Sequence, residues 1–326
     1  MSMAILYKDL TEVEKKVIKG LYWRADDDKD PMTRAEAQEV LASEHGVTER
    51  TIRNWAKKLN VSSIKNTSPA KILCFDIETA AMEVRSFQKW GVNIGDNMIV
   101  RDWFMICWSG KWLFDDKIYS MCQTKEEVLK GDDKRISIGL WNMLDEADIV
   151  IAHNLNKFDR KKANTRFLQH ELGLPSPYKG IDTLLHARRS FAITSNRLDY
   201  IAKNFFGIEG KIRTETDLWN RCVVGDEKAL KAMQLYCDQD VRVLEEVYLK
   251  LRPYIQPHPN VGLHIASDVE VCATCGSDNL FWGSEYKTTV NAYRAYQCNN
   301  CQSWGRSRKG ALSVDERRHI TVSIPS

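Results

Sequence analysis

Hydrophobic and polar positions change their spacing twice along the chain. Residues 1–66 place apolar side chains three and four positions apart, which is the period of amphipathic helices. Two of these helices are separated by Gly46, and Thr33 and Thr48 precede them as suitable N-caps. The segment 66–70 is polar and contains proline, as linkers do. We therefore expect an all-α N-terminal domain over residues 1–66.

Beyond the linker, strand-like and helix-like patterns alternate. Apolar runs predict strands at 72–77, 98–108, 116–121 and 149–153. Amphipathic runs predict helices at 135–146, 159–171, 183–190, 196–206 and 226–251. Early strands with helices interleaved later predict a mixed α/β sheet flanked by helices over residues 70–256. Residues 266–326 combine four cysteines with aromatic and Thr/Val-rich segments, which predicts a small β domain.

Composition narrows the class of protein without naming a partner. The 326 residues are 43% hydrophobic and 28% charged, as in globular proteins of two or three domains. The 47 basic and 44 acidic side chains leave a net charge of only +3, so an argument for nucleic acid has to rest on local charge. The chain shows neither a secretory-signal pattern nor an apolar run of membrane-spanning length. We expect a cytoplasmic protein with no membrane partner.

Two carboxylates stand at the end of the first predicted strand. Asp76 and Glu78 are two positions apart, so both side chains point to the same face of that strand. Neighbouring carboxylates repel each other unless a cation lies between them, and Mg²⁺ or Mn²⁺ prefers carboxylate oxygens. A strand end whose polar side chains face water is the alternative interpretation.

Two further acids lie farther along the chain. Asp159 opens a predicted helix, where it is either a site residue or a carboxylate favoured by the helix dipole. Tyr236 and Asp240 are one helical turn apart, on the face that the apolar stripe of helix 226–251 turns inward. A buried acid on that face is costly unless it is paired or bound to a metal. Asp238 points elsewhere and is excluded from the site.

These motifs resemble those of a known superfamily. The runs FDIET at 75–79, HNLNKFD at 153–159 and YCDQD at 236–240 are similar, in this order, to the exonuclease motifs of the DEDD superfamily, whose fold is ribonuclease H-like. The tyrosine before the last aspartate resembles the DEDDy branch, which includes proofreading domains of family B DNA polymerases and phage exonucleases. Leu235 stands where the histidine branch carries its base. The resemblance covers about residues 70–255.

The resemblance implies a metal-dependent 3′→5′ exonuclease that uses two Mg²⁺ or Mn²⁺ ions. Asp76, Glu78 and Asp240 would ligate one ion. Asp76 would bridge to the second ion, which Asp159 would hold through water. Tyr236 would orient the attacking water while the ions clamp the attacking and leaving oxygens. The expected products are nucleoside 5′-monophosphates, with DNA expected ahead of RNA as the substrate.

Further residues near these motifs are candidates for contact with nucleic acid: Asn154, Phe158, Ser195, Asn196 and Lys211. Ser195 and Asn196 also suit helix capping, as Asp182 does, and capping is the preferred interpretation of these three. His153 is expected to make local hydrogen bonds, because this metal chemistry prefers oxygen ligands.

Four of the nine cysteines form two C-x-x-C pairs near the C-terminus. Cys272 and Cys275 are followed, after 22 intervening residues, by Cys298 and Cys301. This spacing is typical of two knuckles around one tetrahedral Zn²⁺. Four thiolates leave no open coordination position, so the zinc is expected to be structural in a zinc ribbon. The other five cysteines are expected to be reduced, buried thiols.

The predicted ribbon carries local positive charge. Between Tyr286 and Ser313 there are five basic residues and no acidic one, interleaved with aromatic residues. This composition is typical of surfaces that bind a phosphate backbone and stack bases, and the candidate contacts are Arg294, Arg306 and Arg308. In the alternative interpretation the aromatic residues complete a small core, where Tyr296 and Trp304 are the residues expected.

The N-terminal helices have the proportions of a helix-turn-helix. The helix after Gly46 turns Ile52 inward, together with Ala56 and Leu59. Its outer face presents the candidates for DNA contact: Arg50, Arg53, Asn54 and Lys57. A hairpin that docks a protein has the same pattern, so both interpretations remain open.

The leading hypothesis is an exonuclease whose flanking domains hold DNA or a replication or repair protein, in a bacterial or phage-infected cell. A ribonuclease of the same superfamily shares the motifs, because carboxylates do not read the 2′-hydroxyl. A non-catalytic DNA-binding regulator would use the helix-turn-helix and the ribbon alone. The intact set of acids weighs against the regulator, since buried acids are costly to keep.

Overall fold

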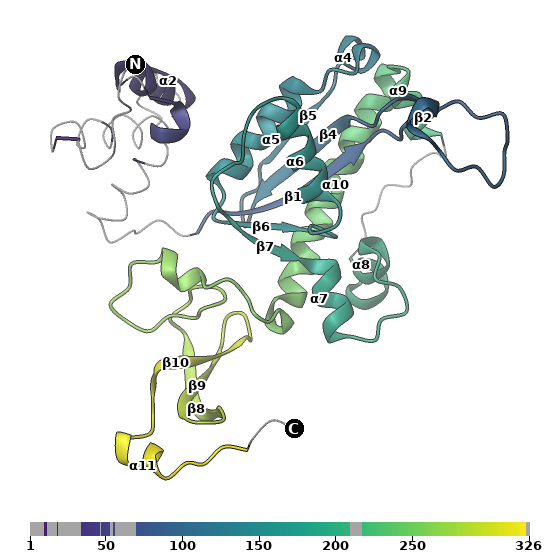
Figure 1. Cartoon of the computed structure of the whole chain (residues 1–326). Helices are drawn as coiled ribbons and strands as arrows, with labels where there is room; N and C mark the ends of the chain where they lie inside the picture. Colours follow the sequence, from purple (N-terminus) through teal and green to yellow (C-terminus); the bar gives the residue numbers. More distant parts are fainter. Residues whose placement is uncertain are drawn as a thin grey trace. The chain divides into compact units, whose positions relative to one another are not determined.

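The computed structural model of the chain describes residues 10, 11, 18, 34–45, 47–52, 55, 70–208 and 217–323 (Figure 1). Contacts between residues divide the chain into two compact units, Met1–Pro69 with His264–Asp268 and Ala70–Leu263 with Val269–Ser326. Among the described residues, no helix combines the length and the apolar character that crossing a bilayer requires.

A five-stranded mixed sheet forms the centre of the larger unit. Its strands are β1 Ile72–Thr79, β4 Met105–Trp112, β5 Ile118–Cys122, β6 Ile149–Ala152 and β7 Lys179–Asp182. They lie in the order β5-β4-β1-β6-β7. β1, β6 and β7 are parallel to one another, whereas β4 runs antiparallel to β1 and to β5. The predicted mixed α/β sheet is thus confirmed.

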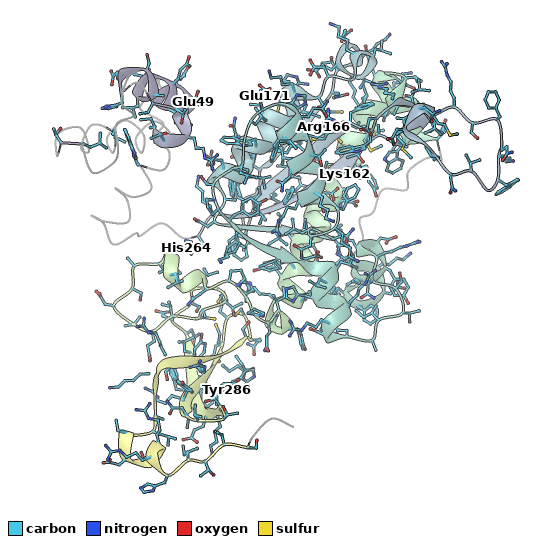
Figure 2. The ribbon with its side chains drawn as sticks, in the orientation of Figure 1. Glu49, Lys162, Arg166, Glu171, His264 and Tyr286 are labelled. Carbon is cyan, nitrogen blue, oxygen red and sulfur yellow. The ribbon has the colours of Figure 1, made fainter. Side chains whose placement is uncertain are left out.

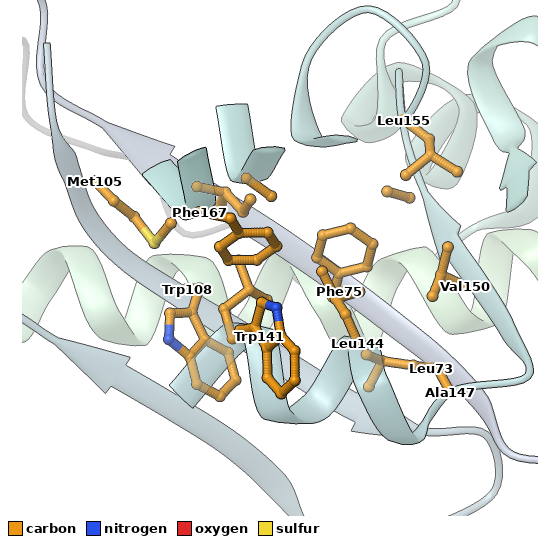
Figure 3. Close-up of a cluster of buried hydrophobic side chains, with 14 of the residues drawn as sticks. Leu73, Phe75, Met105, Trp108, Trp141, Leu144, Ala147, Val150, Leu155 and Phe167 are labelled. Atoms are coloured by element: carbon orange, nitrogen blue, oxygen red, sulfur yellow. The ribbon is translucent and has the colours of Figure 1, made fainter. Parts of the chain in front are cut away.

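The central strand β1 divides its side chains between two environments. Leu73, Phe75 and Ile77 are buried on one face, in a core shared with α5 (Lys134–Glu146) and α6 (Asp159–Gln169). Figure 3 shows this cluster, with aromatic rings from the sheet and from both helices packed together. Because side chains alternate along a strand, the even-numbered residues of β1 face the other side of the sheet.

The other face is covered by α10 (Glu227–Leu251) and α9 (Leu218–Val223). Asp226 caps α10, since its carboxylate accepts the N–H groups of Lys228 and Ala229. The apolar stripe of α10 buries Met233 and Cys237 against the sheet, and the helix crosses it (Figure 1). The middle of α10 is therefore held against the end of β1 that carries the acidic residues.

Short helices complete this α/β domain. They are α4 Lys125–Lys130, α7 Thr183–Ser190 and α8 Leu198–Phe206. α7 follows β7 directly, and both α7 and α8 contact α10. The connection between α7 and α8 therefore lies near the helix that carries Tyr236 and Asp240.

Two parts of the sheet differ from the predicted elements. The run 98–108 is not one strand, because β3 (Ile99–Arg101) ends before β4 begins and pairs instead with β2 (Glu83–Val84). β7 is not among the predicted strands. It has only four residues, two of them exposed, and such a short segment leaves no clear period in the sequence.

The C-terminal part forms a second, three-stranded antiparallel sheet. β8 (Leu280–Lys287), β9 (Ala292–Cys298) and β10 (Trp304–Gly310) lie in the order β10-β9-β8. Three short helices lie outside this sheet: η3 Arg252–Tyr254, η4 Val261–His264 and α11 Val314–Arg318. The small β domain that the sequence predicts is confirmed.

The described N-terminal residues include α2 (Arg34–His45) and the start of a second helix after Val47. The hydroxyl oxygen of Thr48 accepts the N–H of Thr51 at 3.2 Å, which confirms the predicted cap. Ile52 is fully buried, as predicted, in a cluster that also contains Trp55. The predicted cap Thr33, and Gly46, Ala56 and Leu59, lie outside the described residues.

Candidate active site

Three carboxylates converge near the C-terminal end of β1. Asp76 and Glu78 extend from β1, and Asp240 comes from the middle of α10. One carboxylate oxygen from each of these residues lies within 4.8 Å of the other two. Oxygen ligands at this spacing can hold a divalent cation, and Mg²⁺ and Mn²⁺ prefer such ligands.

The electrostatics of this cluster favour a bound cation. The pKa of Glu78 is raised to about 9, first by burial and then by the charges of Asp76 and Asp240. Contact with the side chain of Trp219 opposes part of this rise in pKa. At neutral pH the Glu78 carboxyl therefore keeps its proton unless a cation replaces it. The donor set fits the divalent metal that the sequence predicts.

Asp159 lies beside this cluster, at the first position of α6. It is only 1% exposed, and its polar contacts are with the backbone of Ile77 and with its own backbone N–H. Burial and the charge of Asp76 raise its pKa well above the usual range. Such a carboxylate costs free energy unless a cation compensates it. Asp159 therefore has the environment of a metal-site residue, although it stands outside the group of three.

Tyr236 lies one helical turn before Asp240 and is 7% exposed. Its ring meets that of Trp219 edge to face, with ring centroids 5.9 Å apart. Burial, then the charge of Asp240 and that of Glu78, raises the pKa of the Tyr236 hydroxyl, which also hydrogen-bonds to Asp240. The phenol is therefore neutral at physiological pH and can position a water molecule without acting as a base.

Asp238 is turned away from the cluster, as the sequence predicts. Its carboxylate accepts the hydroxyl of Ser109 at 2.6 Å and the amide of Gln234 at 3.0 Å. The neighbouring Cys237 is buried, with its sulfur 3.7 Å from Oδ2 of Asp76. Burial raises the pKa of this thiol to about 12, so it stays protonated. The five cysteines outside the ribbon are free thiols, and Cys122 is the one of them that is only partly buried.

A groove of about 690 Å³ opens beside Asp76 and Asp240. Three of the residues predicted to contact nucleic acid, Asn154, Ser195 and Asn196, lie along it. They come from the turn after β6 and from the segment before α8. The topology therefore brings two distant segments together next to the carboxylates.

Two arginines that the sequence pattern does not single out also line this groove. Arg188 comes from the last turn of α7, and Arg197 is the residue before α8. Both are exposed. Guanidinium groups bind phosphate oxygens with directed hydrogen bonds, so the pair supplies positive charge where a nucleic-acid strand would approach. In the sequence these residues look like ordinary solvated charges near helix ends. Only their position near Ser195 along the chain indicates that they could belong to the same binding site.

Asp182 shapes the groove by fixing its backbone. Its carboxylate accepts the N–H groups of Asn154 at 3.1 Å, Asn156 at 3.0 Å and Leu185 at 3.1 Å. The last of these bonds caps α7, so the preferred interpretation of Asp182 as a cap is confirmed. Asn154 has a φ of 83°, a left-handed conformation that asparagine tolerates better than most residues.

The preferred capping interpretation is wrong for Ser195 and Asn196. The residue at the N-cap of α8 is Arg197, and no side chain caps that helix. Instead, the carbonyl oxygen of Asn196 lies 2.8 Å from Nε2 of His153, whose Nδ1 lies 2.9 Å from the hydroxyl of Thr183. His153 thus makes the local hydrogen bonds that were predicted. The buried Oδ1 of Asn196 has no partner within the described part of the chain.

The other predicted contact residues vary in how far the structure describes them. Phe158 precedes α6 and is partly buried, with its ring 5.7 Å from Nζ of Lys162. Lys162 and Arg166 lie one turn apart on α6 (Figure 2). Arg50 is exposed, as a recognition helix requires. Four predicted contacts lie outside the described residues: Arg53, Asn54, Lys57 and Lys211.

The two C-x-x-C segments adopt the same backbone structure. In each, the N–H of the first cysteine donates to the carbonyl oxygen five residues later, at 2.7 Å in Cys272–Ser277 and 3.0 Å in Cys298–Ser303. The N–H four residues after the first cysteine donates back to that cysteine, at 2.8 Å from Gly276 and 2.9 Å from Gln302. Both donors have positive φ, which closes the turn.

The four sulfur atoms fit one tetrahedral zinc ion. The Sγ atoms of Cys272 and Cys301 are 3.7 Å apart, those of Cys275 and Cys298 are 3.6 Å apart, and all four lie within 4.8 Å of one another. With Zn–S bonds of about 2.3 Å, the edge of a tetrahedron measures about 3.8 Å. These distances are too long for disulfides. The site has no open position, as a structural zinc site requires.

The surface of the ribbon sheet is basic and aromatic. The guanidinium of Arg306 lies 3.8 Å from the ring centroid of Tyr293, and that of Arg294 lies 4.5 Å from the ring of Trp282. Both arginines and Arg308 are exposed. Tyr296 is buried as predicted, and its hydroxyl oxygen accepts the N–H of Ala273. The prediction that Trp304 is a core residue is wrong, since it is 55% exposed.

Comparison with known proteins agrees with the topology of the sheet. Residues 110–252 match the model of a family described as the RNase_H superfamily. The chain contains a ribonuclease H-like domain. The matched part of this domain includes Asp159, Tyr236 and Asp240, whereas Asp76 and Glu78 precede it on β1.

Among solved structures, the chain is similar to a family B DNA polymerase from the hyperthermophilic archaeon Pyrobaculum calidifontis. The sequence identity is 17% and the TM-score is 0.43, over 70% of this chain and 32% of the polymerase. The chain thus spans about a third of that polymerase. A comparison with proteins of curated function found no match.

Proposed function

We propose that the ribonuclease H-like domain is a divalent-metal-dependent 3′→5′ exonuclease that acts on DNA. The observation that carries this proposal is the convergence of Asp76, Glu78 and Asp240 beside the buried carboxylate of Asp159. A cluster of acids with raised pKa values in a groove is typical of a functional site. The direction of digestion and the release of 5′-monophosphates rest on the resemblance of the motifs to DEDDy exonucleases.

Mg²⁺ or Mn²⁺ held by the four carboxylates would supply Lewis-acid chemistry and neutralise charge at the phosphodiester. The chain itself would position the water. Tyr236 is neutral, lies beside Asp240 and offers both a donor and an acceptor to a water molecule. Because burial and nearby acids raise its pKa, its role is to orient the water rather than to remove its proton. Asp76 and Glu78 of β1, with Asp240, would hold the metal.

The groove beside the acids would hold the 3′ end of the strand. Arg188 and Arg197 would bind backbone phosphates, because their guanidinium groups are exposed along it. Asp182 would keep the Asn154 turn in the shape that admits the strand.

The other parts of the chain would increase affinity for the substrate. The zinc ribbon presents exposed arginines next to aromatic rings, which suits backbone contact and base stacking. The N-terminal helices would bind duplex DNA, or a replication or repair protein, through the face that carries Arg50. In this proposal zinc maintains the ribbon and takes no part in hydrolysis.

The test is digestion of a 5′-labelled single-stranded DNA and of the matching RNA, each with Mg²⁺, Mn²⁺ or EDTA. Wild type should produce a metal-dependent ladder that shortens from the 3′ end, faster on DNA than on RNA. Asp76→Ala and Asp240→Ala should lose this activity by at least about 100-fold. Asp238→Asn is the matched control, because Asp238 lies on the same helix but bonds to Ser109, and it should stay active.

Other outcomes point to the alternatives. Faster digestion of RNA would make the protein a ribonuclease with the same mechanism. If wild type binds both strands but leaves them intact with every metal, the non-catalytic regulator becomes the better description. A ladder that survives in both alanine variants would show that another site, or a contaminant, hydrolyses the strand.

A further inference from the structure

One exposed loop begins at the same end of the sheet as the carboxylates but takes no part in their cluster. β1 ends one residue after Glu78, and β2 begins four residues later, at Glu83. β2 pairs with β3, and the N–H of Arg85 donates to the carbonyl oxygen of Met98 at 2.9 Å. Residues 85–98 are thus a closed loop that projects away from the sheet (Figure 1).

The base of this loop is anchored to the α/β domain. Arg101 of β3 forms an ion pair with Glu83 at 3.7 Å, and its guanidinium lies 4.2 Å from the ring centroid of Phe104. Next along the chain, the ring of Trp103 lies 3.5 Å from Nζ of Lys162 on α6. The position where the loop leaves the domain is therefore fixed by contacts from two sides.

The tip of the loop is aromatic, basic and uncovered. Phe87 is fully exposed and Trp90 is 81% exposed, although large aromatic rings are normally buried at least in part. Nζ of Lys89 lies 5.5 Å from the ring centroid of Trp90. Segment 85–95 contains Arg85 and Lys89 and no acidic residue. Two exposed rings with two cations form a surface complementary to bases and phosphates.

We propose that the loop tip, residues 85–95, binds unpaired nucleotides of the strand whose 3′ end enters the carboxylate site. Phe87 and Trp90 stack on bases, and Arg85 and Lys89 neutralise phosphates. This inference rests on the proposed nuclease function, which supplies a single strand at the site. Phe87 and Trp90 are 9 and 12 positions after Glu78, so the two rings lie within about 30 Å and about 40 Å of that residue at full extension of the chain. Aromatic stacking is tolerant of sequence, as an exonuclease that digests any strand requires.

The test compares a Phe87→Ala/Trp90→Ala variant with Phe114→Ala. Phe114 is a matched control because it is 70% exposed and follows Leu113, whose N–H bonds to Ile72 at the opposite end of β1. Affinity for a fluorescent 20-nucleotide single-stranded DNA is measured by anisotropy without added Mg²⁺ or Mn²⁺ and with Asp240→Ala in every variant, so that no hydrolysis occurs and the ribbon keeps its zinc. The double variant should bind at least 10-fold more weakly than wild type, and the Phe114 variant should bind like wild type.

A second readout uses substrate length. The loop tip can contact a 20-nucleotide strand but not a dinucleotide, so the ratio of kcat/KM for the two substrates should fall at least 10-fold in the double variant. Equal affinities and equal ratios in wild type and the double variant would overturn the inference and leave the exonuclease proposal standing. If wild type hydrolyses neither substrate, the proposed function fails, whereas the anisotropy comparison still decides whether the tip binds the strand.

Discussion

Two buried aspartates near the groove show how the same side chain can serve stability or function. Asp182 satisfies its carboxylate with three backbone N–H groups, so its charge is compensated within the fold. Asp159 is buried to a similar degree, but burial and the charge of Asp76 outweigh its backbone hydrogen bonds and raise its pKa well above the usual range. In the first case the charge holds a turn and a helix in place. In the second the carboxyl keeps its proton until a cation replaces it.

We expect different effects when each carboxyl is replaced. Asp159→Asn should change the stability of the metal-free protein by less than about 1 kcal/mol, because the raised pKa keeps the Asp159 carboxyl protonated there, and it should reduce hydrolysis by at least about 100-fold. Asp182→Asn should lower the free energy of unfolding by about 1–3 kcal/mol, because the amide cannot accept all three hydrogen bonds. Urea unfolding in EDTA and digestion of labelled DNA measure the two effects. A destabilised Asp159→Asn variant would show that Asp159 is compensated within the fold.

At the scale of the element, β1 delivers acids into a partly buried position against α10, and this has a consequence for pH dependence. In the metal-free protein the pKa of Glu78 is about 9, whereas in the unfolded chain a glutamate has a pKa of about 4.3. Between these values the folded state holds a proton that the unfolded state has released. The folded state is therefore stabilised by Glu78 at low pH, and this stabilisation is lost as the pH rises toward 9.

We predict that the free energy of unfolding in EDTA falls between pH 6 and pH 9, by up to about 1.4 kcal/mol per pH unit from Glu78. The melting temperature should fall over the same pH range. Because a divalent ion replaces the proton, Mn²⁺ should raise the melting temperature more at pH 8.5 than at pH 6. Glu78→Gln should make this pH dependence shallower, and the part that remains should come from Asp159, whose pKa is also raised. Thermal melts over this pH range provide the measurement, and a slope that is the same in Glu78→Gln would assign the effect to another group.

How well each of these elements can be predicted from the sequence depends on its length and on how regularly its apolar residues are spaced. The long α10 and the apolar β1 have clear patterns that place Asp76, Glu78 and Asp240 on defined elements, whereas their assignment to one site came from the resemblance of the motifs to DEDDy exonucleases. Ser195 and Asn196 could not be distinguished from caps, because a polar pair before a helix has the same pattern in both roles. Arg188 belongs to the groove only through the packing of α7 against α10, a tertiary relation that no local pattern contains.

For the whole molecule, the ribbon is a small domain that depends on its metal. Its buried residues include three of the four cysteines, so few apolar side chains are available to hold it together. Bound zinc would supply the missing stabilisation by cross-linking the two knuckles.

Purified protein should accordingly contain about one zinc per chain. Cys298→Ser should lose that zinc and weaken binding of single-stranded DNA, because the strands that carry Arg294 and Arg306 start or end at the knuckles. Cys122→Ser, a thiol outside the ribbon, should keep both the zinc and the affinity. Elemental analysis and anisotropy titration supply the measurements. A well-folded wild-type protein without zinc would contradict the ribbon assignment.

The alternation along β1 also limits how this protein can vary. One strand supplies both the packing residues of one sheet face and the acids of the other, in strict turn. Inserting or deleting a single residue before Asp76 would move apolar side chains toward α10 and acids into the hydrophobic cluster at the same time. A substitution changes one position of β1 at a time. An insertion or deletion moves every following side chain to the opposite face of the sheet, and so disrupts the core and the acidic cluster together. We therefore expect natural diversity in this protein to accumulate as insertions in the 85–98 loop and as substitutions within the strand.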